Sequence, residues 1–252
     1  PLDSSSATRD PLFSWEFSAN STTLGVAVSS PGTPLHLFVP KIGAPFMISL
    51  MVNDPQIAEE LVADRKARQI DRYDEVWEDV YIMSPIANNE HQSLATQLSI
   101  AIGTVVDWQN LGRTLTGANV SNRREDWTRN YRIPDILVFK NDTTAEDRDT
   151  HWYGGPELAI EIVSPGDQTL EKLDFYAEVG TRELLVIDRD PWQLTLYRIN
   201  SNCKLVPNAI CRFDAPAQID SQEFPISFSL NPESRSLNVT RDNNVLVRGI
   251  PV

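Results

Sequence analysis

Three stretches of the sequence have the spacing of amphipathic helices. The first, residues 54 to 68, opens with Asp54-Pro55, which is typical of an N-cap residue followed by a proline in the first helical turn. The third covers about residues 170 to 179, with Thr169 as its expected N-cap. The second runs from Glu90 to Gln109 and places apolar side chains on one face: Leu94, Leu98, Ile102 and Val105 or Val106. This second stretch is therefore the predicted core helix.

Short apolar runs separate and follow these helices. Strands are predicted at residues 73–83, 114–120, 136–139, 158–163, 183–188 and 193–197. The order helix, three strands, helix, strand predicts an α/β fold in which helices flank a central mixed β-sheet. Beyond Asn200 only short β-like segments remain, such as 226–230 and 237–240. We expect them to extend the edge of the same sheet.

Two acidic residues stand out against the most apolar strands. Asp135 directly precedes the run Ile136 to Phe139, and Glu161 lies inside the run Leu158 to Val163. A carboxylate in a buried strand carries a large desolvation cost unless a cation compensates it. Carboxylate oxygens are also the ligands that Mg²⁺ prefers. The pair therefore indicates a metal site.

An ordered series of motifs surrounds this pair. Its members are Tyr73 to Val76, Tyr81 to Pro85, Asn88 to Gln92, Tyr131 to Asp135, Gly155 to Pro165, Lys172 with Tyr176, and Glu183 to Asp188. No single motif is specific, but the series over roughly residues 70 to 200 resembles the restriction endonuclease family of bacteria of the Uma-two type. That family belongs to the PD-(D/E)xK nuclease superfamily.

The resemblance implies a restriction-endonuclease-like core that hydrolyses DNA phosphodiester bonds with Mg²⁺ or Mn²⁺. Asp135, Glu161 and the main-chain carbonyl of Ile162 would hold the ion, and Lys172 would orient the attacking water. The superfamily usually carries its lysine two residues after the glutamate, where this chain has Val163. Further residues are implied in supporting roles: Glu75, His91 and Tyr176. Where relatives commonly have a glycine in the first hairpin, this chain has Glu78.

Each candidate also has a purely structural interpretation. Asp135 can cap local amides, Glu161 can form a buried ion pair with Arg132 or Lys172, and His91 can be an ordinary helix histidine. Lys172 can lie on a solvated helix face. If it instead faces the cleft, its nitrogen should lie within ~6 Å of the Glu161 carboxylate, and Lys172→Ala should abolish cleavage yet cost little stability. Glu161→Ala should then abolish metal binding and remove an unpaired buried charge. Three tryptophans are interpreted as core or loop anchors rather than base-stacking platforms: Trp127, Trp152 and Trp192.

Net charge changes the functional picture. The chain of 252 residues carries a formal charge of −13, whereas a DNA-binding protein usually presents a basic face. Five arginines before the strand at 136 offer a local positive patch: Arg113, Arg123, Arg124, Arg129 and Arg132. The charge and Val163 favour an alternative function, a catalytically silent nuclease fold that serves as a binding or regulatory module. A glycosidase acid/base pair formed by Asp135 and Glu161 ranks last.

Composition also sets expectations for organisation. Residues 1–46, rich in Ser, Thr, Pro and Gly, are interpreted as a low-complexity extension, 47–200 as the nuclease core and 201–252 as a β-rich addition to the same domain; Met47 and Met51 are alternative starts. Two cysteines are too few for a disulfide framework, which favours the cytoplasm. No apolar stretch reaches the ~20 residues of a membrane span. The expected partners are DNA and a second copy in a homodimer.

Overall fold

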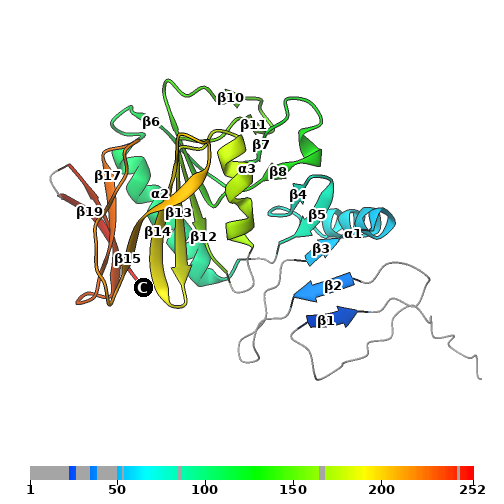
Figure 1. The fold of residues 1–252 in the computed structure, drawn as a ribbon, viewed down its shortest axis with the longest axis horizontal. Helices are drawn as coiled ribbons and strands as arrows, with labels where there is room; N and C mark the ends of the chain where they lie inside the picture. Colours follow the sequence, from blue (N-terminus) through cyan, green and yellow to red (C-terminus); the bar gives the residue numbers. More distant parts are fainter. Residues whose placement is uncertain are drawn as a thin grey trace, which may run out of the picture.

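The computed structural model describes residues 23–26, 35–38, 50–52, 54–84, 87–164, 168–242 and 245–252. A six-stranded sheet in the order β15-β14-β13-β12-β9-β6 forms its centre (Figure 1). Its strands are β6 (Gly112–Thr116), β9 (Ile136–Lys140), β12 (Leu158–Ile162), β13 (Glu183–Arg189), β14 (Trp192–Ile199) and β15 (Leu205–Arg212). Strands β12 and β13 are parallel, and the other neighbours are antiparallel. The predicted central mixed sheet is confirmed.

The two faces of this sheet are covered by different helices. Helix α2 (Asn89–Val105) packs its predicted apolar face, including Leu98 and Ile102, against Ile160 of β12. On the other face, α3 (Leu173–Glu178) packs Tyr176 against Ala159 of β12. Successive side chains of a strand point to opposite faces. Strand β12 is therefore buried on both sides, which explains why its sequence is almost wholly apolar.

The ends of the helices differ in part from the expectations. Helix α1 (Pro55–Ala67) begins as predicted, because the Asp54 carboxylate accepts hydrogen bonds from the amides of Gln56 at 2.9 Å and Ile57 at 3.2 Å. Helix α2 ends before Gln109, since the chain turns there and Asn110 adopts a positive φ of 54°. The third helix is divided into the 3₁₀ turn η2 (Thr169–Lys172) and α3, and its N-cap is Gln168 rather than Thr169.

A second sheet borders the central one and contributes to the cavity described below. It has the order β10-β11-β7-β8-β4-β5-β3, and the short helix η1 (Trp127–Arg129) precedes β8. Its strands are β3 (Leu50–Val52), β4 (Glu75–Trp77), β5 (Val80–Met83), β7 (Val120–Ser121), β8 (Tyr131–Arg132), β10 (Glu146–Asp147) and β11 (Trp152–Tyr153). The hairpin β4–β5 turns through Glu78 and Asp79 with φ of +46° and +67°. This is the left-handed geometry of a two-residue hairpin loop, achieved here without glycine.

The hairpin turn is held by the segment that leads into β8. The amide of Glu78 donates to Asn130 Oδ1 at 3.1 Å, and the amide of Asp79 donates to the Arg129 carbonyl at 2.9 Å. Arg129 also forms a two-pronged ion pair with the Asp79 carboxylate, at 2.6 and 2.8 Å. These contacts compensate for the strain of two non-glycine residues at positive φ.

The C-terminal segment corrects one expectation. Strands β16 (Ile219–Asp220), β17 (Ile226–Asn231), β18 (Ser236–Arg241) and β19 (Val245–Pro251) form a separate four-stranded antiparallel sheet. Only β15 extends the edge of the central sheet. Every second residue of β17 is buried, so the small sheet has one apolar face, and its Phe228 and Val239 share a core with Leu98 of α2. The helix thus lies between two sheets.

Two further strands lie in the N-terminal extension. Strands β1 (Thr23–Val26) and β2 (Leu35–Phe38) pair with each other in antiparallel register and form a two-stranded sheet among the described residues. The rest of residues 1–46 and the candidate start Met47 fall outside the described residues. Met51 lies in β3.

Candidate active site

The backbone brings Asp135 and Glu161 to one edge of the central sheet. Strands β9 and β12 are antiparallel, with Ile136 opposite Ile160. The residue before β9 and the penultimate residue of β12 therefore meet at the same end. Glu161 shares the parity of Ala159, which faces α3, whereas Asp135 lies just before β9 and its carboxylate lies near His91 of α2. The two acids thus lie at one end of adjacent strands and line the same cavity, and their joint role as metal ligands stays a prediction.

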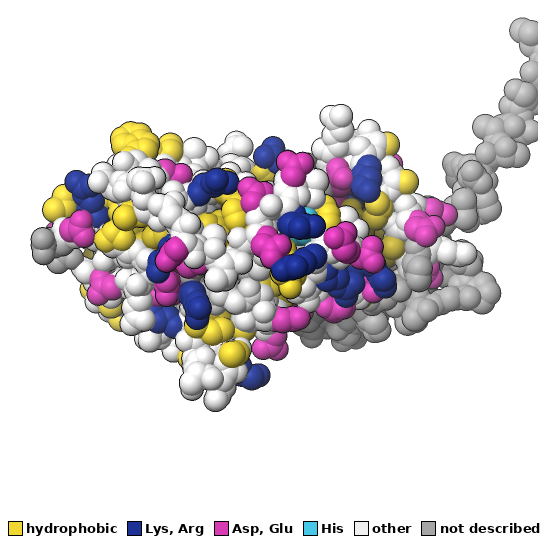
Figure 2. All heavy atoms as spheres, turned by 90° about the horizontal axis from the view of Figure 1, so that it is seen from above, with side chains coloured by type: hydrophobic (Ala, Val, Ile, Leu, Met, Phe, Trp, Pro, Cys, Tyr) yellow, Lys and Arg dark blue, Asp and Glu magenta, His cyan; other side chains and the backbone are white. Residues whose placement is uncertain are grey.

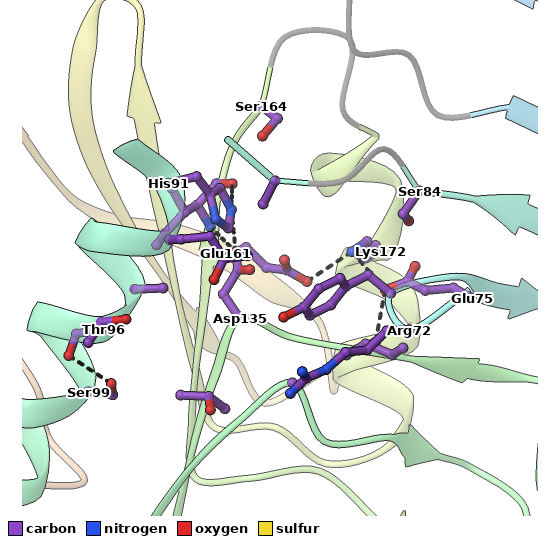
Figure 3. Close-up of a pocket in the computed structure, with 18 residues that line it drawn as sticks. Arg72, Glu75, Ser84, His91, Thr96, Ser99, Asp135, Glu161, Ser164 and Lys172 are labelled. Atoms are coloured by element: carbon purple, nitrogen blue, oxygen red, sulfur yellow. Dashed lines mark hydrogen bonds and ion pairs between the residues drawn. The ribbon is translucent and has the colours of Figure 1, made fainter. Parts of the chain in front are cut away.

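Asp135 is held by main-chain and imidazole groups. Its Oδ2 accepts a hydrogen bond from the Ile162 amide at 2.7 Å and lies 3.3 Å from His91 Nε2. The same His91 nitrogen lies 3.1 Å from the Ile162 carbonyl oxygen. The histidine comes from the first turn of α2, where the Asn88 side chain caps its amide. His91, Asp135 and both polar main-chain groups of Ile162 thus form one connected group (Figure 3).

Glu161 forms a buried charged cluster with side chains of η2, α3 and β4. Lys172 Nζ donates to Glu161 Oε1 at 3.1 Å and to Glu75 Oε1 at 3.0 Å. The Tyr176 hydroxyl also donates to Glu161 Oε1. All four side chains come from residues that are at most 7% exposed. Burial raises the pKa of Tyr176 well above its ordinary value, and the negative charge of Glu161 adds to this effect.

Glu75 connects this cluster to the second sheet. Its Oε1 accepts the Ile133 amide at 2.8 Å as well as Lys172, and its Oε2 accepts the Trp77 indole N–H at 2.7 Å. Both carboxylate oxygens are therefore engaged by protein donors. This fixes the position of Glu75 and, through it, the position of the Lys172 ammonium.

Arg132 supplies a second buried cation beside these acids. Its guanidinium lies between the rings of Trp77, at 4.5 Å, and Phe175, at 4.3 Å. Its Nη1 donates to the Val76 carbonyl at 2.9 Å. Burial lowers the pKa of Arg132, and the negative charge of Glu75 opposes that shift. The sequence offered Arg132 as an ion-pair partner of Glu161, but the direct ion pair is made by Lys172.

The burial of Lys172 corrects two expectations. Its side chain is 8% exposed and bridges two carboxylates that are each 4% exposed, so it does not lie on a solvated face. Removing it must leave buried negative charge behind, and Lys172→Ala is therefore not a low-cost change. Glu161 is likewise not an unpaired charge, so its removal does not relieve one.

A cavity of about 400 Å³ is lined by six of the residues of this site, namely Glu75, His91, Asp135, Glu161, Ile162 and Lys172. Asp135, Glu161 and Lys172 border one part of it (Figure 3). The remainder of its wall is also largely polar and includes Arg72, Tyr73, Gln92, Thr96, Ser99 and Thr116. A wall of this kind suits a polar, charged ligand.

The arginine-rich segment does not form the expected positive patch. Four of its five arginines are paired with acids, namely Arg113 with Asp147, Arg123 with Glu78, Arg124 with Glu146 and Arg129 with Asp79. The fifth, Arg132, is buried. Figure 2 shows basic and acidic side chains next to one another on the face that it presents. The local charge is therefore mixed rather than basic.

The tryptophans are anchors, as predicted. Trp152 stacks on Phe139 with ring centroids 3.9 Å apart, and Trp127 stacks on His151 at 5.0 Å. Trp192 packs against the core that α2 shares with the C-terminal sheet. Burial lowers the pKa of His151, and this histidine lies apart from the cavity wall.

A mixed sheet covered by helices, with paired acids and a lysine at one sheet edge, is the architecture of restriction-endonuclease-like nucleases. Residues 58–233 match the model of the family described as "Putative restriction endonuclease", Uma2, and the chain belongs to this family. No curated protein matches the chain. The chain is also similar to a crystal structure from Anabaena variabilis described as "a putative nuclease belonging to DUF820", with 22% identity and a TM-score of 0.47; the match covers 60% of this chain and 82% of that one.

Proposed function

We propose that the protein is a metal-dependent endodeoxyribonuclease of the PD-(D/E)xK type. The observation that carries the proposal is the meeting of Asp135, Glu161 and Lys172 at one sheet edge inside the polar cavity. Membership of the restriction endonuclease family supports hydrolysis of DNA phosphodiester bonds.

The donor set at this edge fits Mg²⁺ or Mn²⁺. Asp135, Glu161 and Ile162 line the same cavity, and carboxylate and carbonyl oxygens are the ligands that these ions prefer. Glu161 directly precedes Ile162 in the chain. Among the described residues no group of three or more His, Cys, Asp or Glu side chains is arranged to hold a metal. Mg²⁺ does not need one, because it is usually bound by one or two carboxylates, with waters and substrate phosphates as further ligands.

When bound, the ion supplies positive charge for the phosphate and lowers the pKa of a coordinated water. The residues of the chain then have distinct roles. Asp135, Glu161 and the Ile162 carbonyl hold the ion, and His91 positions Asp135 and that carbonyl. The Lys172 ammonium orients the attacking water through its N–H groups. Glu75 anchors Lys172, and Tyr176 fixes the carboxylate of Glu161 by donating to it.

A second candidate function is a catalytically silent module with the same fold. Two observations favour it. Val163 occupies the position where the superfamily usually has its lysine, and the arginine-rich segment is neutralised by acids. Such a protein would retain the fold without cleaving DNA.

Nicking of supercoiled plasmid DNA in Mg²⁺ or Mn²⁺ tests the proposal, together with calorimetric titration of each metal. Asp135→Asn should abolish nicking and weaken metal binding. The matched control is Asp147→Asn, which removes one carboxylate whose side chain is 51% exposed and lies outside the cavity wall. Metal binding without any nicking would favour the silent module, and loss of activity in both variants would contradict the site.

Partners and location belong to the proposal as well. DNA is the proposed substrate, and a homodimer in the cytoplasm stays a prediction. Light scattering that gave the 28.3 kDa mass of one chain across micromolar concentrations would contradict the dimer. Within the described ranges, no helix is long and apolar enough to cross a membrane.

A further inference from the structure

The reacting groups lie too deep for ready access by a stiff ligand. The side chains of Glu161 and Lys172 are 4% and 8% exposed, and only Asp135, at 19%, is more open. The phosphates of a duplex follow the surface of a rod with a persistence length of about 150 base pairs. A single strand bends freely and can direct one phosphate into a cavity.

The surface around the arginine-rich segment also lacks what duplex binding requires. Duplex affinity comes largely from cations that neutralise several phosphates along the rod. Arg113, Arg123, Arg124 and Arg129 are each held by an acidic partner. A DNA phosphate would have to displace these acids, and the formal net charge of −13 opposes its approach.

The cavity wall itself contains groups that can bind an unpaired nucleotide. Arg72 is exposed, and its guanidinium lies 5.5 Å from the centroid of the Tyr73 ring. Across the described part of the chain Arg72 has no acidic partner, in contrast to the four paired arginines of the arginine-rich segment. Hydroxyl groups of Thr96 and Ser99 line another part of the wall (Figure 3). A cation, an aromatic ring and hydroxyls are the groups that hold the phosphate, base and sugar of an unpaired nucleotide.

We propose that the substrate is single-stranded DNA, and that Arg72 and Tyr73 hold the nucleotide next to the phosphate at Asp135, Glu161 and Lys172. The cavity of about 400 Å³ admits a nucleotide-sized group but not the cross-section of a duplex. This inference rests on the proposed function for the identity of the cleaved bond. Binding of the strand is separable from cleavage.

Binding is measured first, in metal-free buffer with EDTA, by fluorescence anisotropy of a labelled oligonucleotide of about 12 nucleotides and of the matched duplex. The single strand should bind about tenfold more tightly or better. Because the protein would contact only one or two phosphates, the slope of the logarithm of the association constant against log[salt] should be about −0.7 to −1.4. Arg72→Gln should weaken the binding and make this slope shallower by about 0.7. The charge-matched control is Arg124→Gln, which removes an arginine paired with Glu146 and should leave both values unchanged.

Cleavage of the same two oligonucleotides in Mn²⁺ separates this inference from the proposed function. Faster cutting of the single strand supports both. Equal or tighter binding of the duplex, or equal losses in Arg72→Gln and Arg124→Gln, overturns the inference even if the duplex is cut. Binding of the single strand without cleavage of either substrate supports the inference and overturns the nuclease proposal. No measurable binding of either oligonucleotide overturns the inference.

Discussion

Replacing Lys172 by methionine tests how the buried charges are balanced. Methionine keeps most of the length of the side chain and removes the ammonium. In the native protein this ammonium donates to Glu75 and Glu161 at 3.0 and 3.1 Å. The variant would remove the ammonium that bridges the two buried carboxylates, while the Arg132 guanidinium would remain near them.

The expected cost is large. Breaking a buried ion pair by removing one partner typically costs about 3–5 kcal/mol, because the remaining charge stays buried without compensation. A domain has about 5–15 kcal/mol of total stability, so the variant should unfold at markedly lower denaturant concentration. Glu161→Gln then gives a sharper test. It should destabilise the native protein by about 1–2 kcal/mol, since it weakens a charge-assisted hydrogen bond.

In the Lys172→Met protein the effect of the same Glu161→Gln substitution on the unfolding free energy should change sign. The substitution removes the charge of one of the two carboxylates that have lost the Lys172 ammonium, and it should therefore recover about 1–3 kcal/mol. The measurement is urea unfolding followed by tryptophan fluorescence for the native protein, both single variants and the double variant. The difference between the two backgrounds gives the coupling energy of the pair.

Lys140→Met is the matched control, because it removes a lysine that forms a more open ion pair. Lys140 and its partner Glu223 have side chains that are 31% and 23% exposed, and such a pair contributes about 0–1 kcal/mol. The reasoning is refuted if Lys172→Met costs no more than this control. It is also refuted if Glu161→Gln destabilises both backgrounds equally.

Three further predictions follow from single contacts. Burial and the charge of Glu161 raise the pKa of Tyr176, so the unfolded state ionises first above the ordinary tyrosine pKa of about 10, and stability falls as the pH rises. In urea titrations Tyr176→Phe should lose less stability than the native protein between about pH 9 and 11, and an equal loss in both proteins would contradict this. Mn²⁺ should raise the Tm of the native protein but not that of Asp135→Asn, and a retained Mn²⁺ effect in the variant would count against Asp135 as a ligand. Without metal, the unfolding free energy of Asp135→Asn should change by less than about 1.5 kcal/mol, because the amide oxygen still accepts the Ile162 N–H. Gly112→Ala should cost about 3 kcal/mol or more, since its Cβ would lie 2.0 Å from the Phe139 carbonyl oxygen, whereas Gly180→Ala, at φ +88° in open space, should cost about 1 kcal/mol. Similar midpoints of the two variants in thermal unfolding would show that the backbone around residues 112 and 139 shifts to relieve the clash.

The central elements could be predicted because their signals are local. The apolar face of α2 and the continuous apolar runs of β9 and β12 follow directly from burial on one or both sides. The residues of the candidate site could be selected in the same way, since one acid opens β9 and one interrupts β12. The register that brings these acids to one end, with Ile136 opposite Ile160, comes from the structure and not from the sequence pattern.

The pairing of the C-terminal strands could not be predicted, because it depends on a distant partner. The alternation in β17 shows one buried face, but it does not show whether that face covers the central sheet or the outer side of α2. The mixed charge around the arginine-rich segment could not be predicted for a related reason. Arginines 123, 124 and 129 lie close in sequence, whereas their partners Glu78, Glu146 and Asp79 are 22 to 50 residues away. Charge patterning along the chain therefore overestimated the basic patch.

The departure at Val163 has a physical explanation in the arrangement of β12 and α3. Residues 159, 161 and 163 point to the same face of the sheet, and Val163 packs with the apolar cluster that includes Ala159 and Tyr176. An ammonium at position 163 would have to be buried among those side chains. Lys172 instead reaches Glu161 from η2, at the edge of the same cluster, where Glu75 from the second sheet provides a second acidic partner. Lys172 thus places a cation 3.1 Å from Glu161, and the position of that cation depends on the contact between the two sheets.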